Sequence, residues 1–318
     1  MPELPEVETI RRALTPRVEG ELLERLEVLD PRFCAPAAPE ELEEAASGRR
    51  IARLARRGKY LVWTLEPDGS TRPKPDHPAP ADAATDSTPP EPLHLVMHLR
   101  MTGNLLLGGP VEAEAPPHLR VRFVLGSGET VLFPDPRRFG TGVALRGDTV
   151  LEEHLGSRIG IEPLEAEFTA KALRELARGR RAPVKAFLLR QERIAGIGNI
   201  YADEALFRAG IHPERPAGTL RRPQLAALRD AVVESLEAGI EARGATIDDF
   251  RQPDGARGSF QDRFLVHRRA GEPCPSCGRE IVKLRVAQRG TYVCEGCQRR
   301  PRRRHSPERA PSAREQAW

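Results

Sequence analysis

The sequence predicts an α+β multidomain protein: an N-terminal β-sandwich with flanking helices, a helical middle region and a short cysteine-containing hairpin. Three observations predict this fold class. Short segments rich in β-branched and aromatic residues, bounded by Gly or Pro, occupy the first half. Helical periodicity begins near residue 169, and four of the five cysteines lie within residues 274–297.

Length and composition are those of a folded chain with more than one domain. The chain has 318 residues, of which 39% are hydrophobic and 30% charged, and its mean hydropathy is −0.48. No stretch approaches the roughly 18 apolar residues of a membrane span. The N-terminus also lacks the apolar core of a secretion signal. We therefore expect a cytoplasmic protein without a membrane partner.

The N-terminal region is expected to begin with a helix over 2–14, because Val7, Ile10 and Leu14 are spaced three and four apart, and Pro16 is expected to end it. A second helix is expected at 40–46. Strands are expected at 60–65, 93–98, 119–125 and 130–133, and their close spacing favours an antiparallel sandwich. Residues 66–92, dominated by Pro, Ala, Asp and Thr, are interpreted as a disordered insertion in a hairpin.

The middle region is expected to form helices at 169–178, 182–191, 200–209 and 223–243. Between the second and third of these, Gly196 and Gly198 permit a tight turn, and Asn199 is a suitable N-cap. The free backbone N–H groups at that helix start offer a phosphate site. An ordinary helix hairpin is the alternative, but Arg180 and Lys185 just upstream favour a nucleic-acid backbone.

Four cysteines form the pattern C-x2-C-x16-C-x2-C: Cys274, Cys277, Cys294 and Cys297. This spacing is typical of four thiolates around one tetrahedral Zn²⁺ ion. Disulfides are the alternative and are rare in the cytoplasm. Because all four ligands are sulfur, we expect a closed structural site that folds a small hairpin.

Charge is distributed unevenly along the chain. Residues 1–48 carry five Arg against twelve Asp and Glu, whereas residues 251–304 carry fourteen Lys and Arg against five acids. The asymmetry favours a polyanion-binding C-terminal region over a merely solvated face. Three of these cations, Lys283, Arg285 and Arg289, lie between the two CxxC turns, where a hairpin would present them together to phosphates.

The first residues could also carry chemistry. A small residue at position 2 permits removal of Met1, which would leave Pro2 with a free secondary amine. An α-amino group has a pKa near 8, so part of it is neutral and nucleophilic near pH 7. Glu3 and Glu6 are then candidate general acids or bases. An acidic helix start is the alternative interpretation of the same residues.

Taken together, these segments resemble the bacterial formamidopyrimidine-DNA glycosylase family. The resemblance is carried in order by MPELPEVETIRR, RRGKYL (56–61), HLRMTG (98–103), DPRRFG (135–140), IAGIGNIYADEALFRAGIHP (194–213) and QRGTYVCEGCQ (288–298). It implies a catalytic β-sandwich at 1–155, a helix–two-turn–helix domain with a lesion-recognition loop at 156–262, a zinc finger at 263–298 and a basic disordered tail at 299–318.

The resemblance also implies residue roles. Pro2 would form a Schiff base with deoxyribose C1′, with Glu3 as proton donor and Glu6 as supporting carboxylate. Lys59 would act in β-elimination, and Arg289 would assist δ-elimination. The DNA contacts would come from Met101, His118, Arg137, Phe139, Arg180, Lys185 and Asn199. Met101, Arg137 and Phe139 of this set would fill the gap left by a flipped base.

The implied function is a bifunctional glycosylase and abasic-site lyase that removes oxidised purines from duplex DNA and nicks the strand by β,δ-elimination. We expect a monomer in the bacterial cytoplasm, associated with the nucleoid. One alternative is an endonuclease VIII-type enzyme acting on oxidised pyrimidines, whose N-terminus usually reads PEGPE. Another is a non-catalytic zinc-ribbon protein that binds damaged DNA. Asp248 departs from the basic residue that relatives often carry in the recognition loop, and His267-Arg268 replace a frequent Tyr-Gly.

Overall fold

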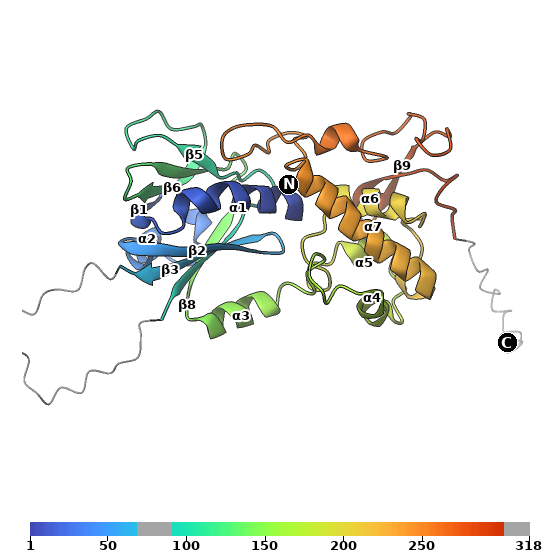
Figure 1. Ribbon diagram of the computed structural model, residues 1–318, viewed down its shortest axis with the longest axis horizontal. Coiled ribbons are helices and arrows are strands. Elements are labelled where there is room, and N and C mark those ends of the chain that lie inside the picture. The colour runs from blue at the N-terminus through green and yellow to red at the C-terminus, as the bar shows by residue number, and fades with distance from the viewer. Residues whose placement is uncertain (69–90, 302–318) are drawn as a thin grey trace, which may run out of the picture.

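The computed structural model describes residues 1–68 and 91–301 of the chain. A sheet-based N-terminal part and a helical C-terminal part lie side by side, and the cysteine-containing hairpin is at the outer end of the helical part (Figure 1). The N-terminus lies at the junction of the two parts, where helix α1 contacts helix α7 (Figure 1). The expected α+β architecture is confirmed.

The N-terminal part is a β-sandwich built from one antiparallel sheet. Within the described residues its eight strands follow the order β5-β7-β6-β1-β2-β3-β4-β8. Their bounds are β1 Leu22–Val28, β2 Arg49–Arg57, β3 Tyr60–Pro67, β4 Leu93–His98, β5 Leu106–Gly108, β6 Leu119–Leu125, β7 Thr130–Pro134 and β8 Thr141–Arg146. β1 and β2 are joined by two residue pairs at the start of each strand, so the sheet divides there into two facing halves.

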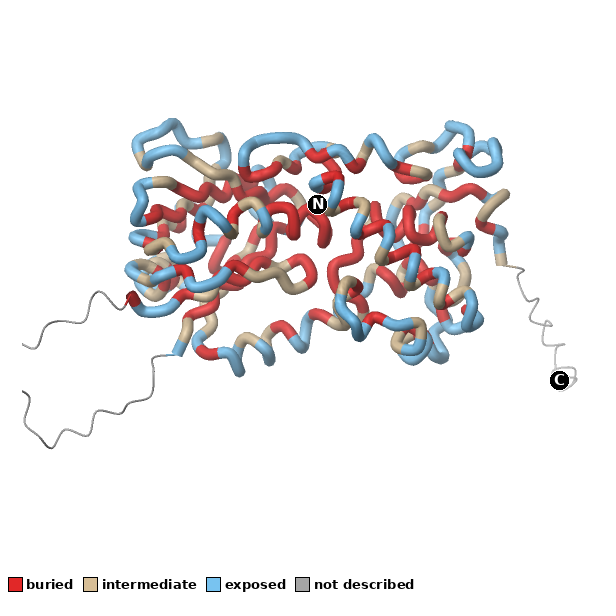
Figure 2. Tube along the Cα trace, viewed as in Figure 1, coloured by how far each residue is buried: buried red, intermediate tan, exposed pale blue. Residues whose placement is uncertain are grey.

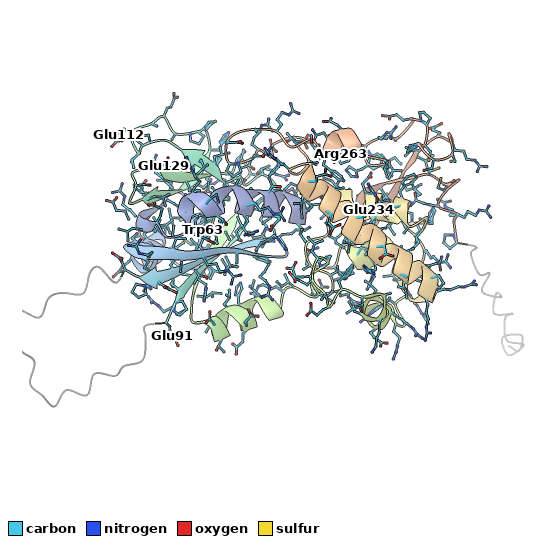
Figure 3. The ribbon with its side chains drawn as sticks, viewed as in Figure 1. Trp63, Glu91, Glu112, Glu129, Glu234 and Arg263 are labelled. Carbon is cyan, nitrogen blue, oxygen red and sulfur yellow. The ribbon has the colours of Figure 1, made fainter. Side chains whose placement is uncertain are left out.

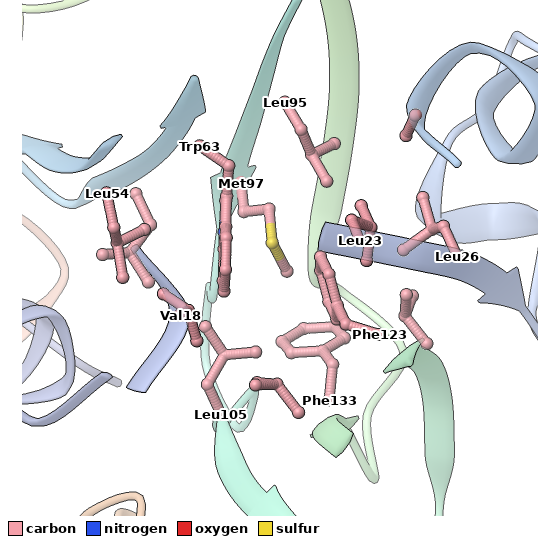
Figure 4. Close-up of a cluster of buried hydrophobic side chains, with 14 of the residues drawn as sticks. Val18, Leu23, Leu26, Leu54, Trp63, Leu95, Met97, Leu105, Phe123 and Phe133 are labelled. Atoms are coloured by element: carbon pink, nitrogen blue, oxygen red, sulfur yellow. The ribbon is translucent and has the colours of Figure 1, made fainter. Parts of the chain in front are cut away.

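The sandwich core lies between these halves. Trp63 of β3 stacks on Phe123 of β6, with 4.8 Å between the ring centroids (Figure 4). Trp63 points into the domain, whereas Glu112 and Glu129 lie at its outer edge (Figure 3). Burial of each large apolar side chain here contributes about 1.5–3 kcal/mol to the free energy of folding. The packed sheet therefore supports the loops at the end of the domain that faces the junction.

Helix α1 (Leu4–Val18) covers this core and continues past the expected stop at Pro16. Val7, Ile10 and Leu14 are fully buried, as their spacing predicts. Pro16 lies in the last turn of the helix, so its missing N–H removes only one hydrogen bond close to the end. The backbone carbonyl of Thr15 accepts the N–H of Glu19 and closes the helix. A proline so close to the end therefore does not stop the helix.

The remaining helices are α2 Pro39–Ala46, α3 Asp148–Gly156, α4 Ala170–Ala177, α5 Val184–Leu188, α6 Asn199–Arg208 and α7 Arg222–Glu241. The C-terminal hairpin is formed by β9 Val282–Val286 and β10 Arg289–Val293. Burial is concentrated at the sandwich core, along α6 and α7 and at the junction between the two parts (Figure 2). No helix in the described ranges is long and apolar enough to cross a membrane.

The two segments that the sequence predicts to be disordered lie largely outside the residues that the structure describes. Of 66–92, the structure describes only the edges, where β3 continues to Pro67 and Asp68 pairs with Arg50 at 2.9 Å. Of the expected tail at 299–318, the structure describes 299–301, and Arg300 pairs with Glu214 at 3.4 Å.

Candidate active site and zinc centre

The first residues of the chain are held between the two parts. The N–H of Leu4 donates to the carbonyl of Gly196, at 3.0 Å, and so ties the start of α1 to the glycine turn before α6. Pro2 and Glu3 are both buried at this seam. Positions 4 and 196 of the sequence are therefore in direct contact, which no local pattern could indicate.

Glu3 occupies the N-terminus of α6. Its Oε1 accepts the N–H of Ile200 at 3.1 Å, and its Oε2 accepts the N–H of Tyr201 at 3.4 Å. Gly198 makes room for this carboxylate, because a Cβ at that position would lie 2.2 Å from the Glu3 Cδ. The expected outward-facing phosphate site at this helix start is therefore wrong: the anion bound there is Glu3. The N-cap is Gly198, so the expected capping role of Asn199 is wrong as well.

Glu6 lies one turn further along α1 and is buried among three donors. Its carboxylate accepts the N–H of Glu3 at 2.9 Å, the N–H of Ala245 at 2.8 Å and the hydroxyl of Tyr201 at 2.8 Å. Burial raises the pKa of Glu6, the charge of Glu3 raises it further, and the three hydrogen bonds oppose the rise. A carboxyl with a raised pKa next to the chain start can hold or release a proton under mild conditions.

Lys59 enters the same site from the tight turn between β2 and β3. Gly58 provides the positive φ of +56° that the turn requires. The Lys59 side chain is buried, and burial lowers the pKa of its ammonium, although the charges of Glu3 and Glu6 partly offset this. A larger fraction of this amine is therefore neutral near pH 7 than for a lysine in water.

These groups line one cleft between the two parts. A hollow of about 330 Å³ includes Pro2, Glu3 and Glu6, and one of about 550 Å³ includes Lys59 and Phe139. The two hollows share Met1, Met101, Asn199 and Arg289, so we treat them as a single feature, the junction cleft. Of the expected site residues, the junction cleft brings together Pro2, Glu3, Glu6, Lys59, Met101, Arg137, Phe139, Asn199 and Arg289.

The loop that carries Arg137 and Phe139 is held by backbone hydrogen bonds to Asp135. The Phe139 side chain is 49% exposed, large for an aromatic residue, and the Arg137 guanidinium lies 4.9 Å from its ring centroid. Fully buried Asp135 accepts the backbone N–H groups of Phe139 at 2.8 Å and Gly140 at 2.7 Å. Asp135 also accepts the hydroxyl of Thr102, which follows Met101. Sequence patterns did not single out Asp135, although an Asp at the start of a turn is a recognisable signal.

Three expected contact residues lie outside the junction cleft. His118 is exposed, and its backbone carbonyl accepts the Asp135 N–H at 3.0 Å. Arg180 is exposed in a separate groove of about 400 Å³ that also contains Arg181, Arg190 and Arg193. Lys185 is fully buried, so it does not reach solvent in this conformation, and the expected direct DNA contact is not available to it.

Asn199 lies at the cleft wall, as expected, with its amide turned toward the hairpin. Its Nδ2 donates to the carbonyl of Gly290 at 3.1 Å. Its buried Oδ1 has no hydrogen-bond partner in the described part of the chain. A buried acceptor without a partner is costly, which favours a donor from a bound molecule at this point.

The four cysteines form the second centre. Their sulfur atoms all lie within 4.8 Å of one another, with 3.8 Å between Cys274 and Cys297 and 3.4 Å between Cys277 and Cys294. Zn–S bonds of about 2.3 Å in a tetrahedron place the sulfurs about 3.8 Å apart, so the donor set fits zinc. The expected single structural Zn²⁺ ion is confirmed, and we call residues 274–297 the zinc hairpin.

Comparison with known proteins defines the class of this chain. Three family models match in order: the formamidopyrimidine-DNA glycosylase N-terminal domain over 1–142, the formamidopyrimidine-DNA glycosylase H2TH domain over 159–251, and a zinc finger found in FPG and IleRS over 271–300. A zinc-containing protein with this domain order belongs to the class of DNA glycosylases.

Curated bacterial relatives match nearly the whole chain. The formamidopyrimidine-DNA glycosylase of Symbiobacterium thermophilum is 42% identical and covers 94% of this chain and 89% of its own. That of Gluconobacter oxydans is 39% identical and covers 94% of this chain and 100% of its own. This chain belongs to the formamidopyrimidine-DNA glycosylase family.

Solved structures agree with this assignment. Lactococcus lactis FPG in complex with DNA containing an abasic site has a TM-score of 0.80 and 33% identity, and covers 94% of this chain and 100% of its own. A variant of the same enzyme in complex with DNA containing Fapy-dG has a TM-score of 0.81 and 33% identity, with the same coverage of both chains.

Proposed function

We propose that this protein is a bifunctional base excision repair enzyme that removes oxidised purines from duplex DNA and then cuts the abasic strand. The observation that carries the proposal is the junction cleft itself. It brings the start of the chain, two buried carboxylates, a lysine of lowered pKa and an arginine from the zinc hairpin to one place. Each of these groups has a distinct part in the reaction.

Pro2 is the proposed nucleophile once Met1 is removed. Its neutral amine attacks C1′ of the damaged nucleotide: the Pro2 N–C1′ bond forms, the bond from C1′ to the base breaks, and the base leaves as an anion that takes a proton from water. Loss of the amine proton and opening of the sugar give an iminium that withdraws electrons from C2′. The Glu3 carboxylate, buried beside Pro2, takes the proton that the amine loses and passes it to the ring oxygen O4′, which opens the sugar.

Glu6 and Lys59 are the proposed proton-transfer groups. Glu6, with its raised pKa, holds a proton close to Glu3 and Pro2. Lys59, with its lowered pKa, removes a proton from C2′, and the C3′–O3′ bond breaks to release the first phosphate. Loss of a second proton, from C4′, breaks the C5′–O5′ bond, and Arg289 stabilises the charge on the departing phosphate. The zinc ion takes no part in these steps, because four thiolates leave no open position; when bound it folds the hairpin.

The base must leave the double helix before this chemistry, at a cost of a few kcal/mol. Exposed Phe139 and half-buried Met101 provide apolar surfaces that occupy the gap, and Arg137 bonds the unpaired cytosine. Asp135 supports this role because its hydrogen bonds hold the loop in this conformation in the absence of DNA. Exposed His118 and Arg180 are proposed to bind flanking phosphates, and Asn199 would do so through the second hydrogen of its Nδ2.

We further propose domain limits of 1–155, 156–262 and 263–298, followed by a basic tail, and a monomer that acts on nucleoid DNA in the cytoplasm. Bacterial relatives support this location. The PELPE start favours oxidised purines over the pyrimidine lesions of the endonuclease VIII-type alternative. Asp248 and Arg268 line the same hollow as Pro2 and Glu3, and we propose that Asp248 affects the choice among purine lesions.

Borohydride trapping tests the proposal. The wild-type protein is mixed with a duplex carrying 8-oxoguanine opposite cytosine, and borohydride reduces any iminium to a stable adduct. We expect a covalent adduct that disappears in Pro2→Gly and after chemical blocking of the N-terminus. Tight binding without an adduct would instead support the non-catalytic alternative. Mature protein that retains Met1 and still incises at full rate would contradict the role of Pro2.

A further inference from the structure

Arg289 lies at the far end of the zinc hairpin from the metal site. Strands β9 and β10 pair from Val282 with Val293, next to the cysteines, to Val286 with Arg289, next to the turn. The zinc ion therefore fixes one end of the hairpin, and Arg289 is at the other. Something other than the metal must determine where Arg289 lies relative to the junction cleft.

The residue after Arg289 is held by two donors from the helical part. The Gly290 carbonyl accepts Lys185 Nζ at 3.0 Å and Asn199 Nδ2 at 3.1 Å. Lys185 also donates to the Thr291 hydroxyl at 2.8 Å. The backbone that carries Arg289 is thus bonded to α5 and to the first residue of α6.

Asp203 of α6 is the centre of this arrangement. Its Oδ1 accepts Lys185 Nζ at 2.7 Å, and its Oδ2 bonds His267 Nδ1 at 2.9 Å and accepts the Tyr292 N–H at 3.4 Å. The His267 ring also makes edge contacts with the Phe264 and Tyr292 rings, at 5.3 Å and 5.1 Å between centroids. We call His267, Asp203 and Lys185 the buried relay.

All three side chains of the buried relay are at most 5% exposed. A buried ion pair adds little net stability, because desolvation of both charges offsets their attraction. A buried ion pair instead fixes the relative positions of its groups, because each polar group has one low-energy arrangement when water is excluded. Here that arrangement joins three separate segments, α5, α6 and the stretch before the zinc hairpin, to β10.

We propose that Asp203 and His267 are positioning residues that hold Arg289 in place for the second elimination. The proposal rests on the role given above to Arg289. His267 orients the Asp203 carboxylate, Asp203 holds the Lys185 ammonium, and Lys185 holds the Gly290 carbonyl. Loosening the relay lets the turn end of the hairpin move while the zinc end stays closed.

The test compares two replacements of His267. His267→Asn keeps a side-chain donor close to the position of Nδ1, whereas His267→Phe keeps the ring and loses the bond to Asp203. His94→Phe is the matched control, because His94 is a buried histidine bonded to Asp148 at 3.0 Å in the N-terminal part, away from the hairpin. Zinc content is measured in every variant, and Asp203→Asn is made as a second way to weaken the relay.

For His267→Phe we expect the rate of δ-elimination to fall about fivefold to tenfold, so that the β-elimination product accumulates. The zinc content should stay near wild type in both His267→Phe and Asp203→Asn. The rate of borohydride adduct formation should stay near wild type in Asp203→Asn, because the Asp203 side chain is fully buried and does not line the junction cleft. His267→Asn should restore most of the wild-type product ratio, and His94→Phe should leave that ratio unchanged. A wild-type product ratio in both His267→Phe and Asp203→Asn would overturn the proposal.

Hydrogen–deuterium exchange at residues 289–292 gives a readout that does not depend on catalysis. We expect faster exchange there in His267→Phe, at unchanged zinc content, and no change in His94→Phe. Unchanged exchange in His267→Phe would also overturn the proposal. A wild-type protein that forms no adduct would refute the proposed function, while the exchange experiment would still decide whether the relay holds the hairpin.

Discussion

The hydroxyl of Tyr201 donates a 2.8 Å hydrogen bond to Oε1 of Glu6, and the backbone N–H of Ala245 donates to the same oxygen at 2.8 Å. Tyr201 is on α6 and Glu6 on α1, so this contact joins the two parts of the molecule beside the chain start. It stabilises the ionised form of a carboxyl whose pKa burial has raised. Loss of the hydroxyl should therefore raise that pKa further.

Tyr201→Phe tests this relationship. Because the deleted hydrogen bond favoured the carboxylate, and Glu6 acts in its protonated form, we expect the basic limb of the base-excision pH–rate profile to move to higher pH. The measurement is single-turnover excision of 8-oxoguanine across pH 5–9. In a Glu6→Gln background the same substitution should not move the limb, since the titrating group is gone. A movement of equal size in that background would contradict the assignment to Glu6.

Lys59→Arg separates the two activities of the enzyme. Arginine remains charged at all relevant pH values and cannot take a proton from C2′. We expect strand cleavage at a preformed abasic site to slow by about a hundredfold. Adduct formation with borohydride should change much less, because the amine of Pro2 is untouched. Equal losses in both assays would indicate that Lys59 serves substrate binding instead.

The ion-pair network behind the junction cleft predicts a loss of stability in acid. Glu8 of α1 bonds Arg11 at 2.7 Å, Arg12 at 2.7 Å and Arg56 at 3.1 Å, and Arg56 reaches Glu162 at 3.0 Å. Burial raises the pKa of Glu8, but its bonds to Arg11 and Arg12 outweigh this and lower the pKa to about 2.

A carboxyl with a lowered folded-state pKa stabilises the fold above its unfolded value of 4.5 and loses that contribution as pH falls toward about 2. Glu8→Gln should lower the free energy of unfolding at pH 7 by about 2 kcal/mol, and by less at pH 3. Urea denaturation at several pH values measures both. A deficit that does not shrink in acid would contradict the pKa assigned to Glu8.

The arginine groove on the helical part predicts a salt effect. Arg180, Arg181, Arg190 and Arg193 line it, and no carboxylate does among the described residues. If Arg180 and Arg181 bind phosphates, replacing both by Ala should reduce the slope of log affinity against log salt by about 0.9 for each phosphate that is no longer neutralised. Arg17→Ala is the control, because Arg17 is exposed and pairs with Glu129 at 3.4 Å. Equal slopes for wild type and the double variant would exclude phosphate binding by this groove.

Zinc removal tests the structural role of the four cysteines. In Cys294→Ser, or after chelation, the zinc hairpin should unfold, and DNA binding should be abolished because Arg289 is no longer presented. The sandwich core around Trp63 should stay folded, which tryptophan fluorescence can follow. Unchanged DNA affinity after verified metal loss would refute this role.

The sequence predicted the sheet-rich and helical halves, the zinc site and most residues of the junction cleft. It missed β1, β2, β5, β8 and α3. β1 and β2 were missed because LLERLEV and RRIARLARR carry leucines and charges at spacings that suit a helix as well as a strand. Partners in the sheet, not local preference, decide their conformation. The burial of Lys185 was missed for the same kind of reason, since Asp203 and the hairpin turn meet it only in the folded chain.

The filling of the α6 N-terminus by Glu3 was equally beyond sequence reasoning, because Glu3 and Ile200 are 197 positions apart. A helix start with exposed N–H groups predicts that an anion binds there, and one does. Its identity depended on how two domains pack, which periodicity and capping rules do not describe.

The placement of Met1 has a practical consequence. Its side chain lies in both hollows of the junction cleft, alongside Met101 and Arg289. An affinity tag fused before Met1 would occupy the same space and block the cleft. Recombinant material intended for assay should therefore carry its purification handle at the other terminus.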